Sequence, residues 1–427
     1  MIERQLLKRI ILEYQNVAKS IQYVPRYMGD MPAGGSVLVG LRRVGKSYML
    51  YQIMSELANA GHPWESFLYL NMEDERLEQF SLADFDELKQ CYEELFDSRP
   101  IFFLDEVQVI EGWEKFVRRV VDQKYTVYVT GSNAKMLSSE LSSTLGGRLF
   151  EKYVYPFSFK EFLTLKGAQI QKHSEFTQEA LLHKAAEEYL QYGGLAEVIL
   201  SQEPLKRSII SNQFNAIFFR DLLIRHKIRG DRALRTMIRK MAESVLHPQS
   251  FARLAHVVSS SGQNIKQSTI ASYVDYMIES LIIFPLENMA ASISERTTIR
   301  KYYFSDNSFV KLFVANPNAH LLENLVALTL RKRFGDDLMY FNYNVEVDFV
   351  VPSQGLAVQA TLEMLETSTF ERECSALFKL AEWKNDVFYD LKIVTLSEER
   401  TVEYASHKIA IVPLWKWLLD NESLSQN

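Results

Sequence analysis

A chain of 427 residues with 47% hydrophobic and 24% charged residues has the composition of an ordinary globular protein and the length for about two to four domains. The net charge of −6 excludes a chain that coats nucleic acid or anionic membrane along its whole length, although a local basic face is still allowed. Cys91 and Cys374 lie far apart without metal-ligand spacing, which excludes a disulfide framework or a zinc module.

The N-terminus and the apolar runs indicate neither export nor membrane insertion. Charged residues begin at the third position, so the apolar core of a signal peptide is missing. No apolar run approaches the length that crosses a bilayer. With only two cysteines, which suits a reducing compartment, we expect a cytoplasmic protein without a membrane partner.

The first predicted element is an amphipathic helix within residues 1–27, where Leu7, Ile10 and Ile11 recur at helical spacing. Proline and glycine residues between positions 25 and 35 end this helix and lead into a short apolar strand over residues 36–39.

A glycine-rich motif, Gly40-x-x-x-x-Gly45-Lys46-Ser47, follows this strand and precedes an apolar-periodic helix. Backbone N–H groups must converge on triphosphate oxygens, and glycine permits the positive φ values and close approach that this requires. Lys46 is suited to contact the β and γ phosphates, and the Ser47 hydroxyl is suited to ligate Mg²⁺. The alternative is a chance match, against which the strand before and the helix after both argue.

The next strong signal is the run Ile101–Leu104, four apolar residues that lead into Asp105 and Glu106. A buried strand that ends in an acid puts Asp105 at the carboxyl edge of a sheet, where open α/β folds bind ligands. We expect Asp105 to hold Mg²⁺ through water and Glu106 to orient and polarise the attacking water. A strand that merely ends at a solvated acid pair is the alternative.

A further strand is predicted over residues 125–130 and ends in small polar groups. We expect the γ-phosphate to lie near Thr130, Ser132 or Asn133 at the end of this strand. The alternative is a turn in which Ser132 caps a helix. A polar helix over residues 138–145 and then Arg148 follow. Arg148 is suited to stabilise charge on a transferred phosphate, in cis or across a subunit contact, and a solvated loop arginine is the alternative.

The candidate site residues fall into three groups. The nucleotide-binding candidates are Gly40, Arg43, Val44, Gly45, Lys46, Ser47, Tyr48, Ser132 and Asn133; the metal candidates are Ser47 and Asp105; the catalytic candidates are Glu106, Lys46 and Arg148.

In their order along the chain, these motifs resemble those of prokaryotic AAA+-type ATPases. The resemblance is closest to an archaeal and bacterial group in which the ATPase precedes a C-terminal domain of unknown function. It implies a parallel sheet in which the Asp105 strand does not directly follow the loop strand, with ATP as the nucleotide and Mg²⁺ as the cofactor. The runs that support it are Gly40–Ser47, Phe102–Gln108, Gly112–Trp113, Thr130–Ser132, Leu145–Arg148, Pro156–Phe162, Gly193–Val198 and Lys301–Asn307.

The middle of the chain, over residues 166–287, is predicted to be helical and contains a basic segment. Between Lys206 and Lys240 there are ten Lys or Arg residues, with Asp221 and Asp231 the acids in the same stretch. This segment could form a face for DNA. A solvated helix surface, or arginines directed at the protein's own nucleotide, are the alternatives.

Two short helices over residues 251–255 and 267–277, joined by a turn that contains Gly262, resemble a helix-turn-helix or winged-helix unit. The second helix has no Lys or Arg beyond Lys266 at its start, so we expect the winged-helix shape rather than direct reading of a base sequence.

The C-terminal part resembles the PD-(D/E)XK restriction-nuclease-like fold. Glu323 matches its helical acid and Asp348 its metal-binding aspartate, but the strand that should end in an acid and a lysine reads Gln359-Ala360-Thr361. Nuclease chemistry needs carboxylates that hold the cation and a lysine beside the attacking water. We therefore expect a nuclease-like domain without activity, kept for binding or as a scaffold.

The complete prediction is an α/β protein with an AAA+-type P-loop domain (1–165), a helical and winged-helix module (166–295) and a nuclease-like domain (296–427). It binds ATP and hydrolyses it with Mg²⁺, and the nucleotide state controls the C-terminal region, with DNA as a candidate partner. The alternatives are a slow nucleotide switch that acts on a protein partner and an ATP-gated, metal-dependent DNA nuclease. An arginine finger in trans would require an oligomer.

Overall fold

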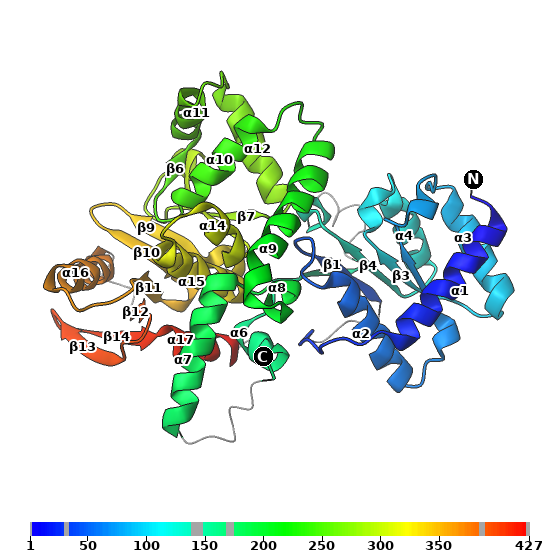
Figure 1. Cartoon of the computed structure of the whole chain (residues 1–427), viewed down its shortest axis with the longest axis horizontal. Coiled ribbons are helices and arrows are strands. Elements are labelled where there is room, and N and C mark those ends of the chain that lie inside the picture. The colour runs from blue at the N-terminus through cyan, green and yellow to red at the C-terminus, as the bar shows by residue number, and fades with distance from the viewer. Residues whose placement is uncertain (1, 30–33, 138–147, 168–174, 384–388, 424–427) are drawn as a thin grey trace. The chain divides into compact units, whose positions relative to one another are not determined.

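The computed structural model describes residues 2–29, 34–137, 148–167, 175–383 and 389–423 (Figure 1). Contacts divide the chain into two compact units, Met1–Tyr155 with Glu279–Leu281, and Pro156–Ile278 with Ile282–Asn427. The first unit therefore ends ten residues before the predicted boundary at 165, and no unit boundary lies near 295. The division into three domains stays a prediction.

The first unit alternates strands with helices. Its elements are α1 (Arg4–Ser20), β1 (Gly35–Val39), α2 (Lys46–Asn59), β2 (Phe67–Asn71), α3 (Asp84–Phe96), β3 (Ile101–Asp105), α4 (Trp113–Asp122), β4 (Val127–Gly131) and β5 (Phe150–Tyr153).

These strands form one parallel sheet in the order β2-β3-β4-β1-β5. The predicted parallel sheet is confirmed, and β4 lies between the loop strand β1 and the Asp105 strand β3. Strands β1 and β4 are buried throughout, as expected where helices cover both faces of a parallel sheet. All strands point the same way, so their carboxyl ends share one edge.

Helix α1 packs on β2 and α3 through the apolar side chains that the periodicity indicated, with Leu7, Ile10 and Ile11 buried. Helix α3 begins at Asp84, after a short 3-10 turn over Glu75–Leu77. The polar helix predicted over residues 138–145 lies outside the described residues.

The second unit begins with helices and a small sheet. Its first elements are α6 (Phe159–Leu165), α7 (Glu175–Tyr192), α8 (Ala196–Leu200), α9 (Glu203–Ile217), a π-helical segment (Phe218–Ile224), α10 (Arg232–Glu243), β6 (Gln249–Ser250), α11 (Phe251–Ser260), α12 (Gln267–Glu279), β7 (Ile283–Leu286), α13 (Ile293–Thr298) and β8 (Ile299–Phe304). Strands β6, β8 and β7 form an antiparallel sheet in that order, so the stretch predicted to be helical also contains strands.

The remainder of the second unit is a mixed sheet with helices. Its elements are α14 (Asn307–Phe313), α15 (Asn318–Phe334), β9 (Met339–Asn342), β10 (Glu346–Val351), β11 (Leu356–Ala360), α16 (Thr367–Trp383), β12 (Asp390–Thr395), β13 (Arg400–Tyr404), β14 (His407–Pro413) and α17 (Leu414–Ser423). The strand order is β13-β14-β12-β11-β10-β9, with β9, β10 and β11 antiparallel and β11, β12 and β14 parallel.

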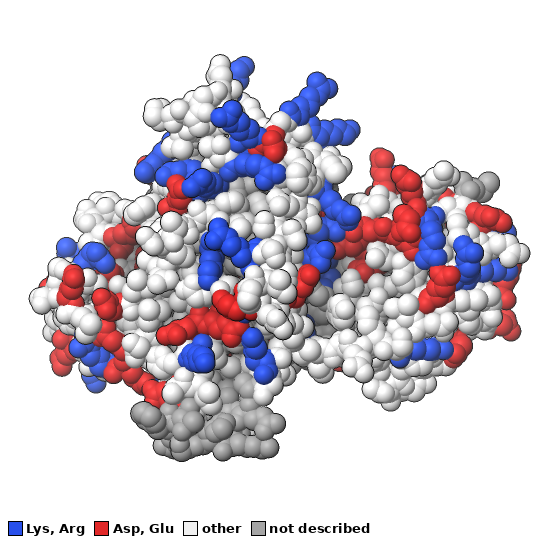
Figure 2. Space-filling view, in the orientation of Figure 1, with Lys and Arg blue, Asp and Glu red and all other residues white. Residues whose placement is uncertain are grey.

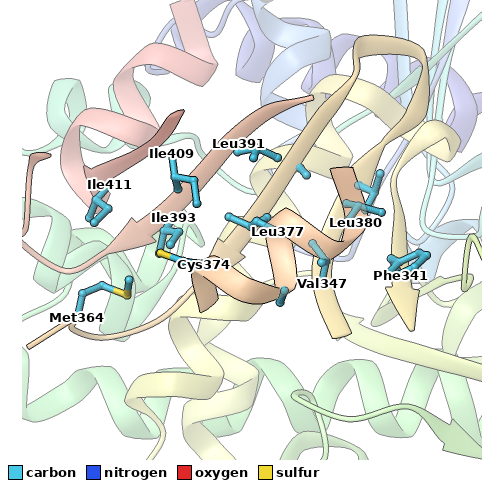
Figure 3. Packing of buried hydrophobic residues seen from close by; sticks show 13 residues of the cluster. Phe341, Val347, Met364, Cys374, Leu377, Leu380, Leu391, Ile393, Ile409 and Ile411 are labelled. Carbon is cyan, nitrogen blue, oxygen red and sulfur yellow. The ribbon is translucent and has the colours of Figure 1, made fainter. Parts of the chain in front are cut away.

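A buried apolar cluster joins α16 to this sheet, as Figure 3 shows. Cys374 and Leu377 of α16 pack with Val347 of β10 and with Ile393 of β12. Side chains alternate along a strand, so Val347 belongs to this cluster while its neighbours Glu346 and Asp348 do not. Both cysteines of the chain are buried free thiols.

Within the part of the chain that the structure describes, we find no helix with the length and apolar character that a bilayer span requires.

Candidate nucleotide-binding site

The glycine-rich loop leaves the carboxyl end of β1 at Gly40. A Cβ atom added to Gly40 would lie 2.3 Å from the carbonyl oxygen of Val154, so the close approach of β5 requires glycine here. Gly45 has a φ of 96°, in the left-handed region, and α2 begins at the next residue. The loop thus leads directly into the N-terminal amides of a helix, which favour an anion.

Lys46 is the first residue of α2, and its side chain is buried. Its Nζ donates hydrogen bonds to the carbonyl oxygens of Gly40 and Leu41, at 3.2 and 3.3 Å. It also forms an ion pair of 3.1 Å with Oε1 of Glu106. The lysine ammonium therefore joins the loop to the residue that follows β3.

Asp105 ends β3 and is completely buried. Its carboxylate accepts hydrogen bonds from the hydroxyls of Tyr69, at 2.8 Å, and of Thr130 and Ser47. Burial and then the charge of Glu106 raise the pKa of Asp105, while the three hydrogen bonds favour the ionised form. The structure thus brings the two predicted metal ligands, Ser47 and Asp105, into direct contact.

Glu106 has a φ of 51°, and its backbone N–H donates to the hydroxyl of Thr130 at 2.9 Å. Its carboxylate accepts a hydrogen bond of 2.6 Å from Gln108. Burial opposes ionisation, but the charge of Lys46 and the Gln108 hydrogen bond lower the pKa of Glu106 to about 2. Glu106 is therefore an ionised, oriented carboxylate at neutral pH.

The polar end of β4 lies beside the loop, since the N–H of Gly40 donates to the carbonyl oxygen of Gly131 at 3.2 Å. Ser132 is buried and accepts a hydrogen bond of 3.3 Å from Gln108. Asn133 instead uses its side-chain oxygen to accept the N–H of Lys135, at 2.9 Å, and so stabilises the turn that follows. Asn133 thus holds the first residues of the short helical turn over Ala134–Leu137.

The other three candidates lie on the loop and the first turn of α2. Arg43 is exposed and has a φ of 68°, Val44 is buried, and Tyr48 is half exposed with its ring edge-on to Tyr51. Contact of these residues with a nucleotide stays a prediction.

Arg148 is the predicted catalytic residue that the structure does not bring to this edge. It lies two residues before β5, whose Phe150 is in register with Ser36 near the start of β1. Its guanidinium forms an ion pair of 2.5 Å with Asp122, the last residue of α4. Arg148 is thus at the opposite edge of the sheet from Lys46, so its position gives no support to a role on the nucleotide of its own chain, and that role stays a prediction. A role across a subunit contact stays a prediction.

Two residues at the site have no role in the sequence interpretation. Tyr69 comes from β2 and holds Asp105, and Gln108 connects Glu106 with Ser132. Beside the loop, Arg42 forms a two-bond ion pair with Glu73, at 2.7 and 2.9 Å. Because Gln108 follows Glu106 by two residues, its contact with the Glu106 carboxylate could have been predicted from the sequence. The contacts of Tyr69 and Glu73 depend on strand order and could not.

The depressed pKa of Glu106 predicts a pH dependence of stability. An ionised Glu106 stabilises the fold above its ordinary pKa of 4.5, and this contribution is lost as the pH falls through the folded value of about 2. Between about pH 5 and pH 2, the wild type should lose about 3 kcal/mol more of its free energy of unfolding than Glu106→Gln. Denaturant unfolding at a series of pH values measures this difference, and equal losses in the two proteins would contradict it.

The basic segment of the second unit is less positive than its sequence suggests. Lys206 is buried and pairs with Glu188 at 2.5 Å, so it does not belong to an exposed face. Further ion pairs join arginines and lysines of the segment to acids: Arg225–Asp221, Arg235–Asp231, Arg239–Glu243 and Lys240–Glu243. Figure 2 still shows blue side chains gathered over the face formed by α9, α10 and α12.

Helix α12, the second helix of the predicted winged-helix unit, buries its apolar side chains in the second unit. Val274 and Met277 are buried, and the ring of Tyr276 stacks on His226 with centroids 3.8 Å apart.

Comparison with known proteins adds the family. Residues 35–163 match the family model described as an AAA domain, and residues 183–318 match one described as a domain of unknown function, DUF8612. Uncharacterized protein MJ1544 of Methanocaldococcus jannaschii is 31% identical over 98% of this chain and 96% of that protein. An uncharacterized protein of Haemophilus influenzae is 30% identical over 78% of this chain and 83% of that protein. The chain belongs to the same family as these proteins.

The first unit of this family member contains an AAA-type P-loop ATPase domain, in which the loop, Asp105 and Glu106 lie. Apart from Glu279–Leu281, the second match lies within the second unit and ends at residue 318, inside the predicted nuclease-like domain (296–427) but before Glu323 and Asp348. Neither relative has a described activity.

Solved structures show weaker likenesses. A Walker-type ATPase of Pyrococcus abyssi is 14% identical with a TM-score of 0.43, covering 73% of this chain and 96% of that one. The ORC1 protein of Aeropyrum pernix in complex with DNA is 13% identical with a TM-score of 0.31, covering 73% and 91%. We draw no functional conclusion from scores this low.

Proposed function

We propose that the AAA domain binds ATP with Mg²⁺ at the glycine-rich loop and hydrolyses it. The main support is that Lys46, Asp105 and Glu106 meet at one edge of the sheet, with Lys46 and Glu106 in direct contact at 3.1 Å. Hydrolysis of ATP needs a lysine that contacts the phosphates, an acid that binds the metal ion and an acid that orients the attacking water.

The residues at the site fit a magnesium ion. Mg²⁺ prefers hard oxygen ligands, and the Ser47 hydroxyl and the Asp105 carboxylate supply them at the end of the loop. When bound, Mg²⁺ would supply positive charge that offsets the negative charge of the phosphates. The hydroxyls of Tyr69 and Thr130 hold Asp105 in place for this role.

In the proposed reaction, Lys46 leaves Glu106 and turns to the phosphates. Glu106, with its orientation set by Gln108, is then free to accept a proton from the attacking water. The preference for adenine rests on the family, since the loop contacts phosphates rather than the base.

A second candidate function is a slow nucleotide switch that acts on a protein partner. The Lys46–Glu106 ion pair favours it, because a buried pair must open before either residue can act. A barrier of this kind would lower turnover without preventing binding.

We further propose that the second unit contains a winged-helix module. The order α10, β6, α11, α12, β7, β8 with sheet order β6-β8-β7 supports this interpretation.

The order α15, β9, β10, β11, α16, β12 likewise supports the nuclease-like fold. Because Gln359 and Thr361 stand where an acid and a lysine are needed, we propose binding or scaffolding there rather than cleavage. The cytoplasmic location stays a prediction.

Phosphate release measured with and without duplex DNA tests the proposed partner. If the exposed cations Arg207, Lys227, Arg229 and Arg232 contact phosphates, DNA should stimulate ATP hydrolysis at low salt, and the stimulation should fall steeply as salt rises. Hydrolysis that DNA does not change would contradict a DNA role and favour a protein partner.

A further inference from the structure

Lys301 of β8 is a completely buried lysine surrounded by carboxylates. Its Nζ lies 3.0 Å from Oε1 of Glu323, 2.7 Å from Oε1 of Glu346 and 3.2 Å from Oδ1 of Asp348. Glu323 comes from α15, and the other two acids come from one face of β10. We call these four residues the Lys301 cluster.

The ammonium of Lys301 donates hydrogen bonds to Glu323 and Asp348 and forms an ion pair with Glu346. An ammonium has three donors, and the cluster offers three carboxylate oxygens within hydrogen-bond distance. Burial disfavours its charge, but the surrounding acids raise the pKa of Lys301 well above its ordinary value, so it stays protonated. Burial and then the charge of Asp348 raise the pKa of Glu323 to about 8. One buried positive charge therefore faces three carboxyl groups.

The side chains of Asp348 and Gln359 also form hydrogen bonds with backbone groups of the neighbouring strands. Oδ2 of Asp348 accepts the N–H of Ala360 at 3.1 Å. The side-chain amide of Gln359 forms two hydrogen bonds with the backbone of β10. Its oxygen accepts the N–H of Asp348 at 2.8 Å, and its nitrogen donates to the carbonyl oxygen of Glu346 at 3.2 Å. Gln359 is thus a strand-to-strand connector rather than a ligand directed at a cation.

The cluster also connects two sheets of the second unit. Lys301 belongs to the sheet β6-β8-β7, whereas Glu346 and Asp348 belong to the six-stranded sheet. The hydroxyl of Tyr303, two residues along β8, donates to Glu323 at 2.7 Å and extends the same network. Among the residues that the structure describes, no group of three or more His, Cys, Asp or Glu side chains could hold a metal ion.

We propose that the Lys301 ammonium is a built-in cation that takes the place of a divalent metal between Glu323, Glu346 and Asp348. The carboxylates bind this lysine and join the two sheets, which makes this part of the protein independent of metal. The comparison of Lys301 with a metal ion rests on the proposed nuclease-like fold, in which acids at these positions would hold a cation. It does not depend on ATP binding or hydrolysis at the glycine-rich loop.

Removal of the ammonium should expose a latent metal site. Lys301→Met keeps the unbranched side chain up to its last atom and removes the ammonium, so the acids are left free to bind a hard divalent cation. In nucleotide-free buffer, Mn²⁺ should raise the melting temperature of Lys301→Met by several degrees, because a ligand that binds only the folded state stabilises it. The wild type should show no such rise, and neither should Lys301→Met combined with Asp348→Asn.

Lys392→Met is the matched control, because Lys392 pairs with Asp390 at the surface of the same unit. It should respond to Mn²⁺ like the wild type. A folded Lys301→Met protein without a Mn²⁺ response would overturn the proposal.

A direct Mn²⁺ titration of the wild type, followed by the electron paramagnetic resonance signal of free Mn²⁺, decides the question even if Lys301→Met does not fold. Binding that Asp348→Asn removes would show a native metal centre and overturn the proposal, while no Asp348-dependent binding supports it. ATP hydrolysis enters neither measurement, so failure here is separate from failure of the proposed ATPase function.

Discussion

Lys46→Ala should lower the affinity for ATP by about 10- to 100-fold. Hydrogen bonds to charged groups contribute about 1.5–3 kcal/mol, and Lys46 is the cation that the loop places for the phosphates. The loss can be measured by titration with a fluorescent ATP analogue in the presence of Mg²⁺. Lys115→Ala, which removes an exposed lysine of α4 in the same unit, should leave the affinity unchanged.

The same substitution has a second effect that must be separated from the first. Without Lys46, the buried carboxylate of Glu106 loses its ion pair, and breaking a buried pair by removing one partner costs about 3–5 kcal/mol. The double variant Lys46→Ala/Glu106→Gln removes both charges, so it should recover much of this stability. If it also recovers ATP affinity, Lys46 acts through folding and the proposed phosphate contact is wrong.

Glu106→Gln should keep nucleotide binding and lower the rate of phosphate release by about 10²–10⁴-fold. The amide has the shape of the carboxylate but does not accept a proton, and general base catalysis contributes about this much. Because the ion pair with Lys46 is removed, the affinity for ATP should be unchanged or higher. Single-turnover phosphate release with saturating enzyme measures the chemical step.

The control for this substitution is Glu111→Gln, which removes an exposed acid shortly after the site. Its phosphate release should equal that of the wild type. Unchanged release in Glu106→Gln would show that Glu106 is not the base. A wild type that binds ATP tightly but hydrolyses it no faster than ATP is hydrolysed without enzyme would instead favour the slow switch.

Two features of the structure differ from what the spacing of residues along the chain suggested, and they have one physical cause. The position of Arg148 depends on where β5 enters the sheet, and the weaker basic face depends on which acids the arginines meet after folding. Both are contacts between segments, and neither follows from the spacing of residues within one segment.

The Lys301 cluster shows the same limit in the second unit. The sequence indicated that the lysine expected at Thr361 is missing, which is correct. It did not indicate that Lys301, from a different sheet, lies between Glu323 and Asp348. Residues far apart in the chain meet here because β8, α15 and β10 pack together.

The sequence by itself determined the phosphate-binding loop, the acids after β3 and the parallel α/β class. These features are local: a motif, its flanking strand and helix, and a run of apolar residues are each read within about fifteen positions. Only the tertiary structure decided the strand order that sets β4 between β1 and β3, the pairing of Lys46 with Glu106, and the support of Asp105 by Tyr69. Those contacts form between residues distant in sequence, and their geometry is set by packing rather than by local pattern.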